Sequence, residues 1–497
     1  MTEACNKVQL IPVHCADLSN YVRCNMPDGI SDFFQHHSFA CRMIFSLYMM
    51  AMPIWNIHGI PQPDHLSYDH IRISYFMEDV TPPLESPLAF GTARIVHDSL
   101  SARGIVLQFD EYPVVLCAVD WIGISNEGMD YFKEKLAEAV ETKPERISVH
   151  ALHLHDGVRG DLTAPRLLDR YGESEIYYDT IFLRHVIDRV AFSARKAMEE
   201  SQPVTHIGFG QARVKKVASN RRILNRAGKV QAMRWNNTSN WEIRNEPEGL
   251  IDPMLKMVTF WNGEDPVVSM SYYAVHPVTY FGEGIVSADF VGIARKNQEN
   301  RQEIPQIYFT GAAGNIGTGK YNDGSVRIRQ VLAARLSQAM EEAFAQTIRF
   351  SLEKKDVKWK SAEVYLPLAS FMIKDSLESI LAGELYDPEL PFLRSISSLA
   401  WLERVHRKPE VQVSALHIKE IRLLHLPGEP FVEYQLAAQK YFPDLKICTA
   451  AYGEYGMGYI GTAIAYDQGG YETSKMASNV SPEAEKDLLT AIRKVLE

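Results

Sequence analysis

Short apolar runs and longer amphipathic segments alternate along the chain. The short runs predict strands, because a strand alternates its faces or, when covered on both sides, is apolar throughout. The expected strands cover 72–76, 102–109, 113–119, 147–152, 204–214, 254–261, 266–273, 305–310, a stretch near Val364, 418–426 and 446–450. Apolar residues at helical spacing predict helices over 128–141, 175–200, 326–347, 431–439 and 482–496. The strand–helix–strand order of 113–152 indicates an α/β fold with a layered core.

The longest predicted helix is 175–200. Its apolar residues Ile181, Val186, Ile187 and Val190 are assigned to one stripe. A helix with such a stripe normally buries it against a sheet or another helix. We therefore expect these four side chains to face the core.

Composition restricts the class of protein. The 497 residues are 46% hydrophobic and 23% charged, which is typical of an ordered globular chain. A net charge of −10 argues against a protein that binds a nucleic-acid backbone. Four of the six cysteines lie in the first 41 residues, so the remaining body shows no disulfide framework. The chain is expected to divide into an N-terminal extension, 1–65, and a single large domain, 66–497.

The extension contains an apolar run at 43–55, which is too short to span a bilayer. No long apolar run occurs elsewhere, so no membrane span is expected. The sequence defines no compartment, although the cytoplasm is favoured over secretion, and it leaves the oligomeric state open.

The strongest local motif is the segment 147–157, ISVHALHLHDG, with His153 and His155 two residues apart after an apolar run. Side chains two apart on an extended strand point the same way, so both imidazoles can face one cleft. Imidazole is a natural zinc ligand. Two core-edge histidines at this spacing also arise by chance. A metallo-β-lactamase pattern is excluded by Gly157 and Val158, whereas a barrel amidohydrolase stays open as an alternative.

Three later segments add candidate chemistry. His276 ends a β-rich run before a proline, and a small-residue turn follows at 311–314. Glu429 lies in a Pro-Gly turn after an apolar strand, where it could enter a cleft or simply stabilise the start of helix 431–439. The Gly/Tyr-rich loop 452–459 is interpreted as a packing element.

In this order the motifs resemble the neutral (neutral/alkaline, non-lysosomal) ceramidase family. The similar segments are DVTPP at 79–83, HDSLSAR at 97–103, HALHLHDG at 150–157, AVHP at 274–277, LPGEPF at 426–431 and the tyrosines at 459, 466 and 471. The match is collinear from about residue 71 to the C-terminus.

This resemblance implies a layered mixed-sheet catalytic domain of the neutral ceramidase type. It implies zinc as the cofactor, with His153, His276, Glu429 and Tyr459 as ligands. His155, Arg221 and Tyr471 correspond to the residues that contact the substrate. The implied reaction is hydrolysis of an amide, such as an N-acyl lipid, by metal-activated water.

Two departures from the family's pattern indicate which branch of the family the chain resembles. Gly317 stands where the ceramidases keep an active-site serine, and only 26 residues follow Tyr471, which leaves no room for the family's C-terminal immunoglobulin-like domain. The chain therefore resembles the short bacterial-type branch, whose substrate could be another amide or an ester. The alternative hypothesis is a zinc- or ligand-binding protein without catalysis on the same scaffold.

Overall fold

A five-stranded mixed sheet carries the first part of the chain. The computed structural model describes residues 70–171 and 174–497, so the predicted extension 1–65 lies outside the described residues. The sheet order is β10 (Gln202–Val204), β1 (Ile71–Asp79), β5 (Ser101–Gln108), β6 (Val114–Val119) and β8 (Ile147–Ala151). β6 is buried along its whole length, as its continuous apolar run predicted, and it pairs in parallel with β8.

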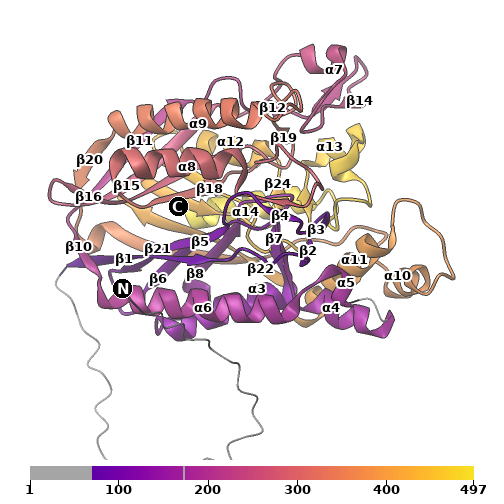
Figure 1. Cartoon of the computed structure of the whole chain (residues 1–497), viewed down its shortest axis with the longest axis horizontal. Coiled ribbons are helices and arrows are strands. Elements are labelled where there is room, and N and C mark those ends of the chain that lie inside the picture. Colours follow the sequence, from indigo (N-terminus) through magenta and orange to yellow (C-terminus); the bar gives the residue numbers. More distant parts are fainter. Residues whose placement is uncertain (1–69, 172–173) are drawn as a thin grey trace, which may run out of the picture. The chain divides into compact units, whose positions relative to one another are not determined.

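Helices α3 (Asn126–Ala139) and α6 (Thr180–Glu199) cover one face of this sheet (Figure 1). The prediction of a single helix over 175–200 is wrong. The structure has a short α5 (Ser174–Tyr177) and then α6, whose first turn is capped by Asp179, which accepts a hydrogen bond from the Phe182 amide at 2.9 Å.

The stripe assigned to this helix is also partly wrong. Val186, Ile187 and Val190 are fully buried, whereas Ile181 is 84% exposed. Ile181 precedes Val190 by nine residues, which places it about 180° away around a helix of 3.6 residues per turn. Leu183 completes the buried stripe instead.

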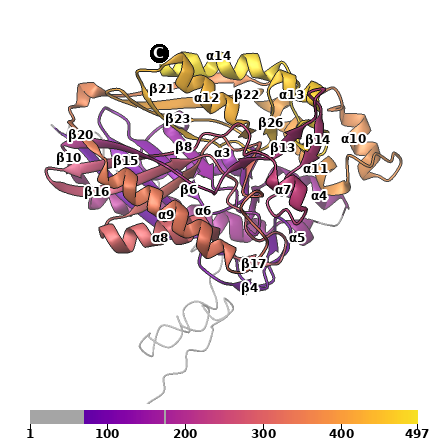
Figure 2. The same ribbon diagram turned by 90° about the horizontal axis from the view of Figure 1, so that it is seen from above.

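A second mixed sheet packs its inner face against the first, and the two share one hydrophobic core. Its order is β18 (Gln306–Thr310), β16 (Asp265–Tyr273), β15 (Met254–Asn262), β11 (His206–Arg213) and β20 (Ile348–Ser351). Helices α8 (Asp289–Gln302) and α9 (Ile328–Ala345) cover its outer face, which gives four layers in the order helix, sheet, sheet, helix (Figures 1 and 2). The strand predicted over 204–214 is divided at Thr205, where the chain passes from β10 in one sheet to β11 in the other.

A four-stranded third sheet consists of β21 (Val357–Tyr365), β22 (Glu410–Ile418), β23 (Ile421–His425) and β25 (Lys446–Ala450). Helices α12 (Val432–Tyr441) and α14 (Ala484–Leu496) pack against its strands. The strand predicted over 418–426 is in fact the turn and second arm of a hairpin. Lys419, at a φ of 53°, reverses the chain there. Helices α10 (Lys374–Leu381) and α11 (Phe392–Arg407) precede β22 and were not predicted.

Short strand pairs tie together the loops at the ends of the three sheets. β24 (Glu429–Pro430) pairs with β26 (Tyr459–Ile460), and β12 (Ser219–Asn220) pairs with β19 (Ile316–Gly317). The remaining short elements are β2 (Pro87–Leu88), β3 (Gly91–Thr92), β4 (Ile95–Val96), β7 (Gly123–Ser125), β9 (Arg159–Asp161), β13 (Arg222–Leu224), β14 (Val230–Met233), β17 (Ile285–Val286), α4 (Thr163–Leu168), α7 (Trp241–Asn245) and α13 (Ala463–Gln468).

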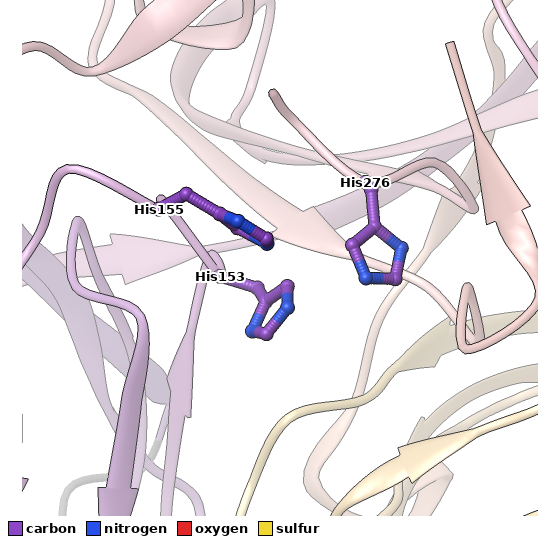
Figure 3. A group of neighbouring side chains, drawn as sticks. All are labelled: His153, His155 and His276. Carbon is purple, nitrogen blue, oxygen red and sulfur yellow. The ribbon is translucent and has the colours of Figure 1, made fainter. Parts of the chain in front are cut away.

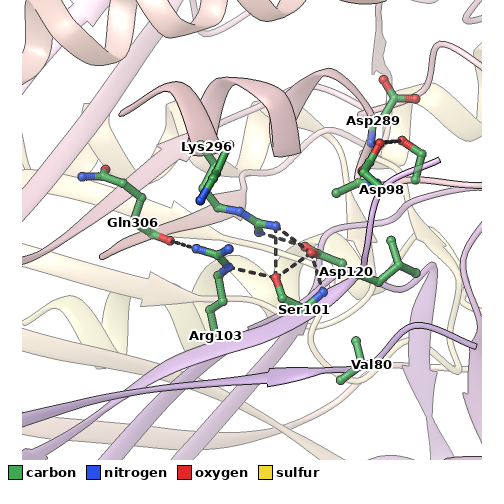
Figure 4. A network of polar contacts seen from close by, with 12 residues as sticks. Val80, Asp98, Ser101, Arg103, Asp120, Asp289, Lys296 and Gln306 are labelled. Carbon is green, nitrogen blue, oxygen red and sulfur yellow. Dashed lines mark hydrogen bonds and ion pairs between the residues drawn. The ribbon is translucent and has the colours of Figure 1, made fainter. Parts of the chain in front are cut away.

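A buried ion pair joins the two packed sheets to α8. The carboxylate of Asp120 accepts hydrogen bonds from both terminal nitrogens of Arg295, at 2.9 and 2.7 Å, and from the amide and hydroxyl of Ser101, each at 2.8 Å (Figure 4). The same Ser101 hydroxyl accepts from Arg103, which also donates to the carbonyl of Gln306 in β18. Every polar atom of the Asp120 carboxylate is therefore matched.

The predicted α/β class is confirmed by this architecture. Cys117 and Cys448 are both free thiols buried in the core. No helix among residues 70–171 and 174–497 is both long and apolar enough to cross a membrane.

Candidate metal centre

His153 and His155 lie in a tight turn after β8. The strand ends at Ala151, four residues before His155, so neither histidine lies on it. His153 has a φ of 71°, and the Trp121 carbonyl accepts hydrogen bonds from the amides of both His153 and Leu154, at 2.9 and 3.1 Å. The two rings nevertheless stand together, with centroids 4.9 Å apart (Figure 3). The two rings therefore lie together, and the turn rather than an extended strand brings them there.

His276 and Glu429 converge on His153 from separate segments. Glu429 Oε2 lies 3.3 Å from His153 Nε2 and 3.2 Å from His276 Nε2. All three residues are at most 2% exposed. Ligand atoms around a tetrahedral zinc at its usual bond lengths are about 3.3–3.4 Å apart, so these separations fit one ion between them.

Backbone carbonyls fix the tautomer of both imidazoles. His153 Nδ1 donates to the Ile122 carbonyl at 2.9 Å, and His276 Nδ1 donates to the carbonyls of Ala313 and Ile316 at 2.8 and 2.9 Å. A neutral ring that donates through Nδ1 has only a lone pair at Nε2. The two Nε2 lone pairs therefore face a carboxylate oxygen that accepts no hydrogen bond from any described residue. Three buried acceptors that face one another could hold a metal ion.

The pKa values agree with this protonation state. Burial lowers the pKa of His276 to about 4, assisted by the nearby Arg221 cation. Burial likewise lowers the pKa of His153. Burial would raise the pKa of Glu429, but the two imidazoles and the Tyr455 hydroxyl outweigh it and lower that pKa to about 2. Near pH 7 the cluster is two neutral imidazoles and one carboxylate, a common zinc ligand set.

A shell of tyrosines surrounds these three residues. The Tyr455 hydroxyl donates to Glu429 Oε1 at 2.6 Å, and the Tyr452 ring stacks on His153 with centroids 4.6 Å apart. The Tyr459 hydroxyl lies 3.4 Å from His276 Nε2, so it is near the centre as the resemblance implied. Burial raises the pKa of Tyr459 well above 10, which leaves this residue as a neutral phenol.

Arg221 is a buried cation at the edge of the centre. Its Nη2 donates to the Tyr459 hydroxyl at 3.2 Å and to the Gly314 carbonyl at 2.7 Å, and it pairs with Glu472 at 3.1 Å. The Tyr471 ring lies 5.8 Å from the Tyr459 ring. Arg221 and Tyr471 are thus beside the cluster without being part of it.

His155 occupies the outer side of the cluster. Neither ring nitrogen has a hydrogen-bond partner among the described residues. Burial lowers its pKa well below 6.5, so the ring is neutral. The rings of Phe90 and Phe281 approach it at 5.3 and 5.2 Å. His153, His155 and His276 also form a three-histidine group whose nitrogens lie within 4.8 Å of one another, a second ligand set that the geometry allows.

Gly317 lies where Arg221 and Asn236 meet. A Cβ atom at position 317 would be 2.8 Å from Asn236 Oδ1 and 3.2 Å from Arg221 Cδ. The Asn236 Oδ1 atom is buried and has no partner among the described residues. The site is therefore built around a glycine here, and the space that a serine side chain would use is filled by other side chains.

Sequence reasoning missed four residues of this region: Tyr452, Tyr455, Glu472 and Asn236. The loop 452–459 was interpreted as packing, but it supplies the hydroxyl that binds Glu429. The spacing of tyrosines in that loop was the available signal. Asn236 and Glu472 carry no local pattern that would distinguish them.

Comparison with known proteins supports the fold. The sequence matches no protein-family model and no curated protein. The crystal structure of neutral ceramidase from Pseudomonas aeruginosa is similar, with a TM-score of 0.64 and 16% identity, over 86% of this chain and 74% of that one. A ceramidase complexed with C2 gives a TM-score of 0.63 and 14% identity over the same shares.

The fold and the site together define a class of protein. It is a layered α/β protein that buries a His–His–Glu cluster at the ends of its sheets. More narrowly, the chain has the fold of the neutral ceramidases, and the resemblance predicted from its motifs is confirmed at the level of the fold.

Proposed function

We propose that the protein is a zinc-dependent amidohydrolase that cleaves an N-acyl amide, with an N-acyl lipid as the favoured class of substrate. The observation that carries the proposal is the convergence of two lone-pair nitrogens and one carboxylate oxygen, with separations of 3.2 and 3.3 Å, in a buried site. The fold shared with two ceramidases supports the amide as the bond that is cleaved.

His153, His276 and Glu429 would hold the ion, with the Tyr459 phenol adjacent. When bound, zinc supplies a Lewis acid that activates water and polarises a carbonyl. The surrounding residues contribute positions and charge. Arg221 is anchored by Glu472 and holds the Tyr459 hydroxyl in place. A hydroxyl fixed in this way is preorganised to donate to an oxygen on which negative charge develops.

His155 and Tyr471 would contact the substrate itself. The unpartnered nitrogens of His155 can hold a proton of the amide or of its leaving amine. Phe90 and Phe281, which are 37% and 56% exposed, pack against the His155 ring and against each other at 4.5 Å. An apolar wall beside the reacting bond suits an acyl chain.

A non-catalytic binding protein is the second candidate. Two observations favour it: glycine at position 317, with its side-chain space filled, and a cavity beside His155 of only about 10 Å³. An esterase would use the same residues as the amidase, since both reactions form a tetrahedral oxyanion.

Metal analysis of purified protein and variants separates these functions. We expect about one equivalent of zinc in the wild-type protein, and its loss in His153→Ala and in Glu429→Ala, because each removes one ligand atom. Hydrolysis of a panel of N-acyl amides and esters should fall in both variants by more than about 100-fold, since changes to the outer shell alone cost 10- to 100-fold. His185→Ala, at an exposed position of α6, is the matched control.

The proposal is contradicted if the purified wild-type protein holds no metal and the His153→Ala variant hydrolyses the amides as fast as the wild type does. Zinc bound through these residues without hydrolysis of any panel member would instead favour the binding protein.

A further inference from the structure

His155 and Asp156 are the two central residues of a tight turn. The turn is closed by a hydrogen bond from the Gly157 amide to the Leu154 carbonyl, at 3.1 Å. Only glycine fits at position 157, since a Cβ atom there would lie 2.9 Å from that carbonyl oxygen and 3.1 Å from Trp121 Cα. The backbone that carries both side chains is therefore closely constrained.

Each of these two side chains has buried polar atoms without a partner. Both ring nitrogens of His155 and the Oδ2 atom of Asp156 form no hydrogen bond with any described residue. The other carboxylate oxygen, Oδ1, accepts a hydrogen bond from the Gly284 amide at 3.2 Å, and Asp156 is only 6% exposed. A buried donor or acceptor without a partner costs free energy, so water or a ligand normally completes such atoms.

A small cavity, of about 10 Å³, is lined by both side chains. This is about the smallest space that holds one water molecule, and such a molecule needs at least two polar partners. His155 and Asp156 supply them. The other lining residues are Leu154, Pro277, Tyr280, Ile285, Ser287 and Asp289.

The other polar side chains of this cavity already have partners. The Ser287 hydroxyl donates to the Asp98 carboxylate at 2.8 Å and accepts from the Asp289 amide at 2.9 Å. The Asp289 carboxylate accepts from the amide and the hydroxyl of Thr279, at 2.7 and 2.8 Å. Ser287, Asp289 and Tyr280 have no buried side-chain oxygen that lacks a partner among the described residues. The unmet hydrogen-bonding capacity of the lining side chains thus belongs to the two residues of the turn.

The two side chains are complementary, because one is an acceptor and the other carries a donor. Burial raises the pKa of Asp156 to about 6, although the Gly284 amide opposes the shift, so at about pH 8 the carboxyl is ionised and only accepts hydrogen bonds. His155 is a neutral ring with one N–H. A water molecule between them can accept from that N–H and donate to Asp156 Oδ2, which satisfies both atoms.

We propose that Asp156 positions His155 through one buried water molecule and thereby fixes which nitrogen of the ring carries the proton. Backbone carbonyls do this for His153 and His276, whereas neither nitrogen of His155 has a partner among the described residues. With one nitrogen committed as a donor to the water, the other keeps its lone pair for the substrate. This role rests on the proposed function, in which His155 contacts the substrate.

Long-range proton–nitrogen NMR spectra of the full chain with isotope-labelled histidine report the tautomer directly, and His155→Gln identifies the signal. We expect one neutral tautomer in the wild-type protein at about pH 8. Asp156→Asn should convert it to the other tautomer or to a mixture, because a carboxamide can donate to the water and reverse the bridge. Glu283→Gln removes an exposed carboxylate next to Gly284 and should leave the signal unchanged. The signals of the other histidines show whether each variant is folded.

Hydrolysis of the amide panel gives the second measurement. In Asp156→Asn we expect kcat to fall about 10- to 100-fold with little change in KM, since the contacts with the substrate are kept and only the ring is wrongly protonated. The zinc content should equal that of the wild-type protein, because no proposed ligand is changed.

The inference is overturned if the His155 signal is the same in Asp156→Asn as in the wild-type protein, if Glu283→Gln changes that signal equally, or if kcat is unchanged in Asp156→Asn. The tautomer is measured without turnover. A protein that hydrolyses no member of the panel would therefore contradict the proposed function, while the spectra still decide whether Asp156 positions His155.

Discussion

Tyr455 shows how a single residue outside the proposed ligand set can orient a residue of the candidate metal centre. Its hydroxyl donates to the Glu429 oxygen that does not face the histidines, which fixes the orientation of the carboxylate. The ring fits because position 123 is a glycine; a Cβ there would lie 2.5 Å from Tyr455 Cδ1. Outer-shell hydrogen bonds of this kind hold ligands in place and tune their basicity.

We expect Tyr455→Phe to lower zinc affinity about 10- to 100-fold, because the substitution removes only this hydrogen bond and keeps the ring. Competition with a chromophoric chelator measures the affinity. Tyr386→Phe, at a side chain that is 86% exposed, is the control and should bind zinc like the wild-type protein. Equal affinities of the Tyr455 variant and the control would show that the hydroxyl does not support the metal site.

Prediction from the sequence failed for helices whose buried face is polar. Strands and amphipathic helices with apolar stripes, such as β6 and α9, were expected because burial and hydrophobicity coincide there. Helix α8 was not predicted, since its buried face includes Asp289, Arg295 and Gln298, whose partners lie on other elements. Helix α11 likewise buries serines. Their periodicity is visible only when those partners are known.

The buried ion pair between Asp120 and Arg295 contributes to the stability of the fold. Burial opposes ionisation of Asp120, but Arg295 outweighs it and the pKa of the carboxyl is lowered. We expect Asp120→Ala to lower the free energy of unfolding by about 3–5 kcal/mol, because it leaves the Arg295 charge buried and unpaired. Urea denaturation measures the change.

Asp120→Leu combined with Arg295→Met should recover much of that loss, since no buried charge then remains. Glu138→Gln, in an exposed pair with Lys135, is the control and should leave the free energy of unfolding unchanged. A double variant as unstable as Asp120→Ala would show that packing rather than charge controls this contact.

At the scale of the whole molecule, the candidate site is assembled from segments that are far apart in the sequence. Local patterns predicted the α/β class and most strands, and the collinear motifs placed seven candidate residues that the fold brings together. The motifs could not predict how these residues are held, because the Trp121, Ala313 and Ile316 carbonyls that position the histidines belong to the backbone and leave no trace in side-chain identity.

Stability should depend on pH through Glu454, which belongs to the loop 452–459 and faces Arg404 of α11. Burial raises its pKa to about 7, although Arg404 and the amides of Asn126 and Gly456 act in the opposite direction. The folded state therefore binds this proton more tightly than the unfolded state does. The associated stability is fully present below about pH 4.5 and is lost as the pH rises through about 7.

Glu454→Gln removes this dependence. Relative to the variant, the wild-type protein should lose on the order of 3 kcal/mol of unfolding free energy between pH 5 and 8. Chemical denaturation in buffers without carboxylates measures the difference, and Glu134→Gln controls for the loss of one negative charge. A constant difference between wild type and Glu454→Gln across this range would refute the prediction.

The burial of His153, His276 and Glu429 has a consequence for the way an ion would enter the site. His153, His276 and Glu429 are oriented by carbonyls and a phenol of the protein itself, and all are almost completely enclosed. Such an enclosed group offers an ion no open route. Exchange would then be controlled by transient local opening of the chain, so an ion captured during folding would be released far more slowly than its affinity alone suggests.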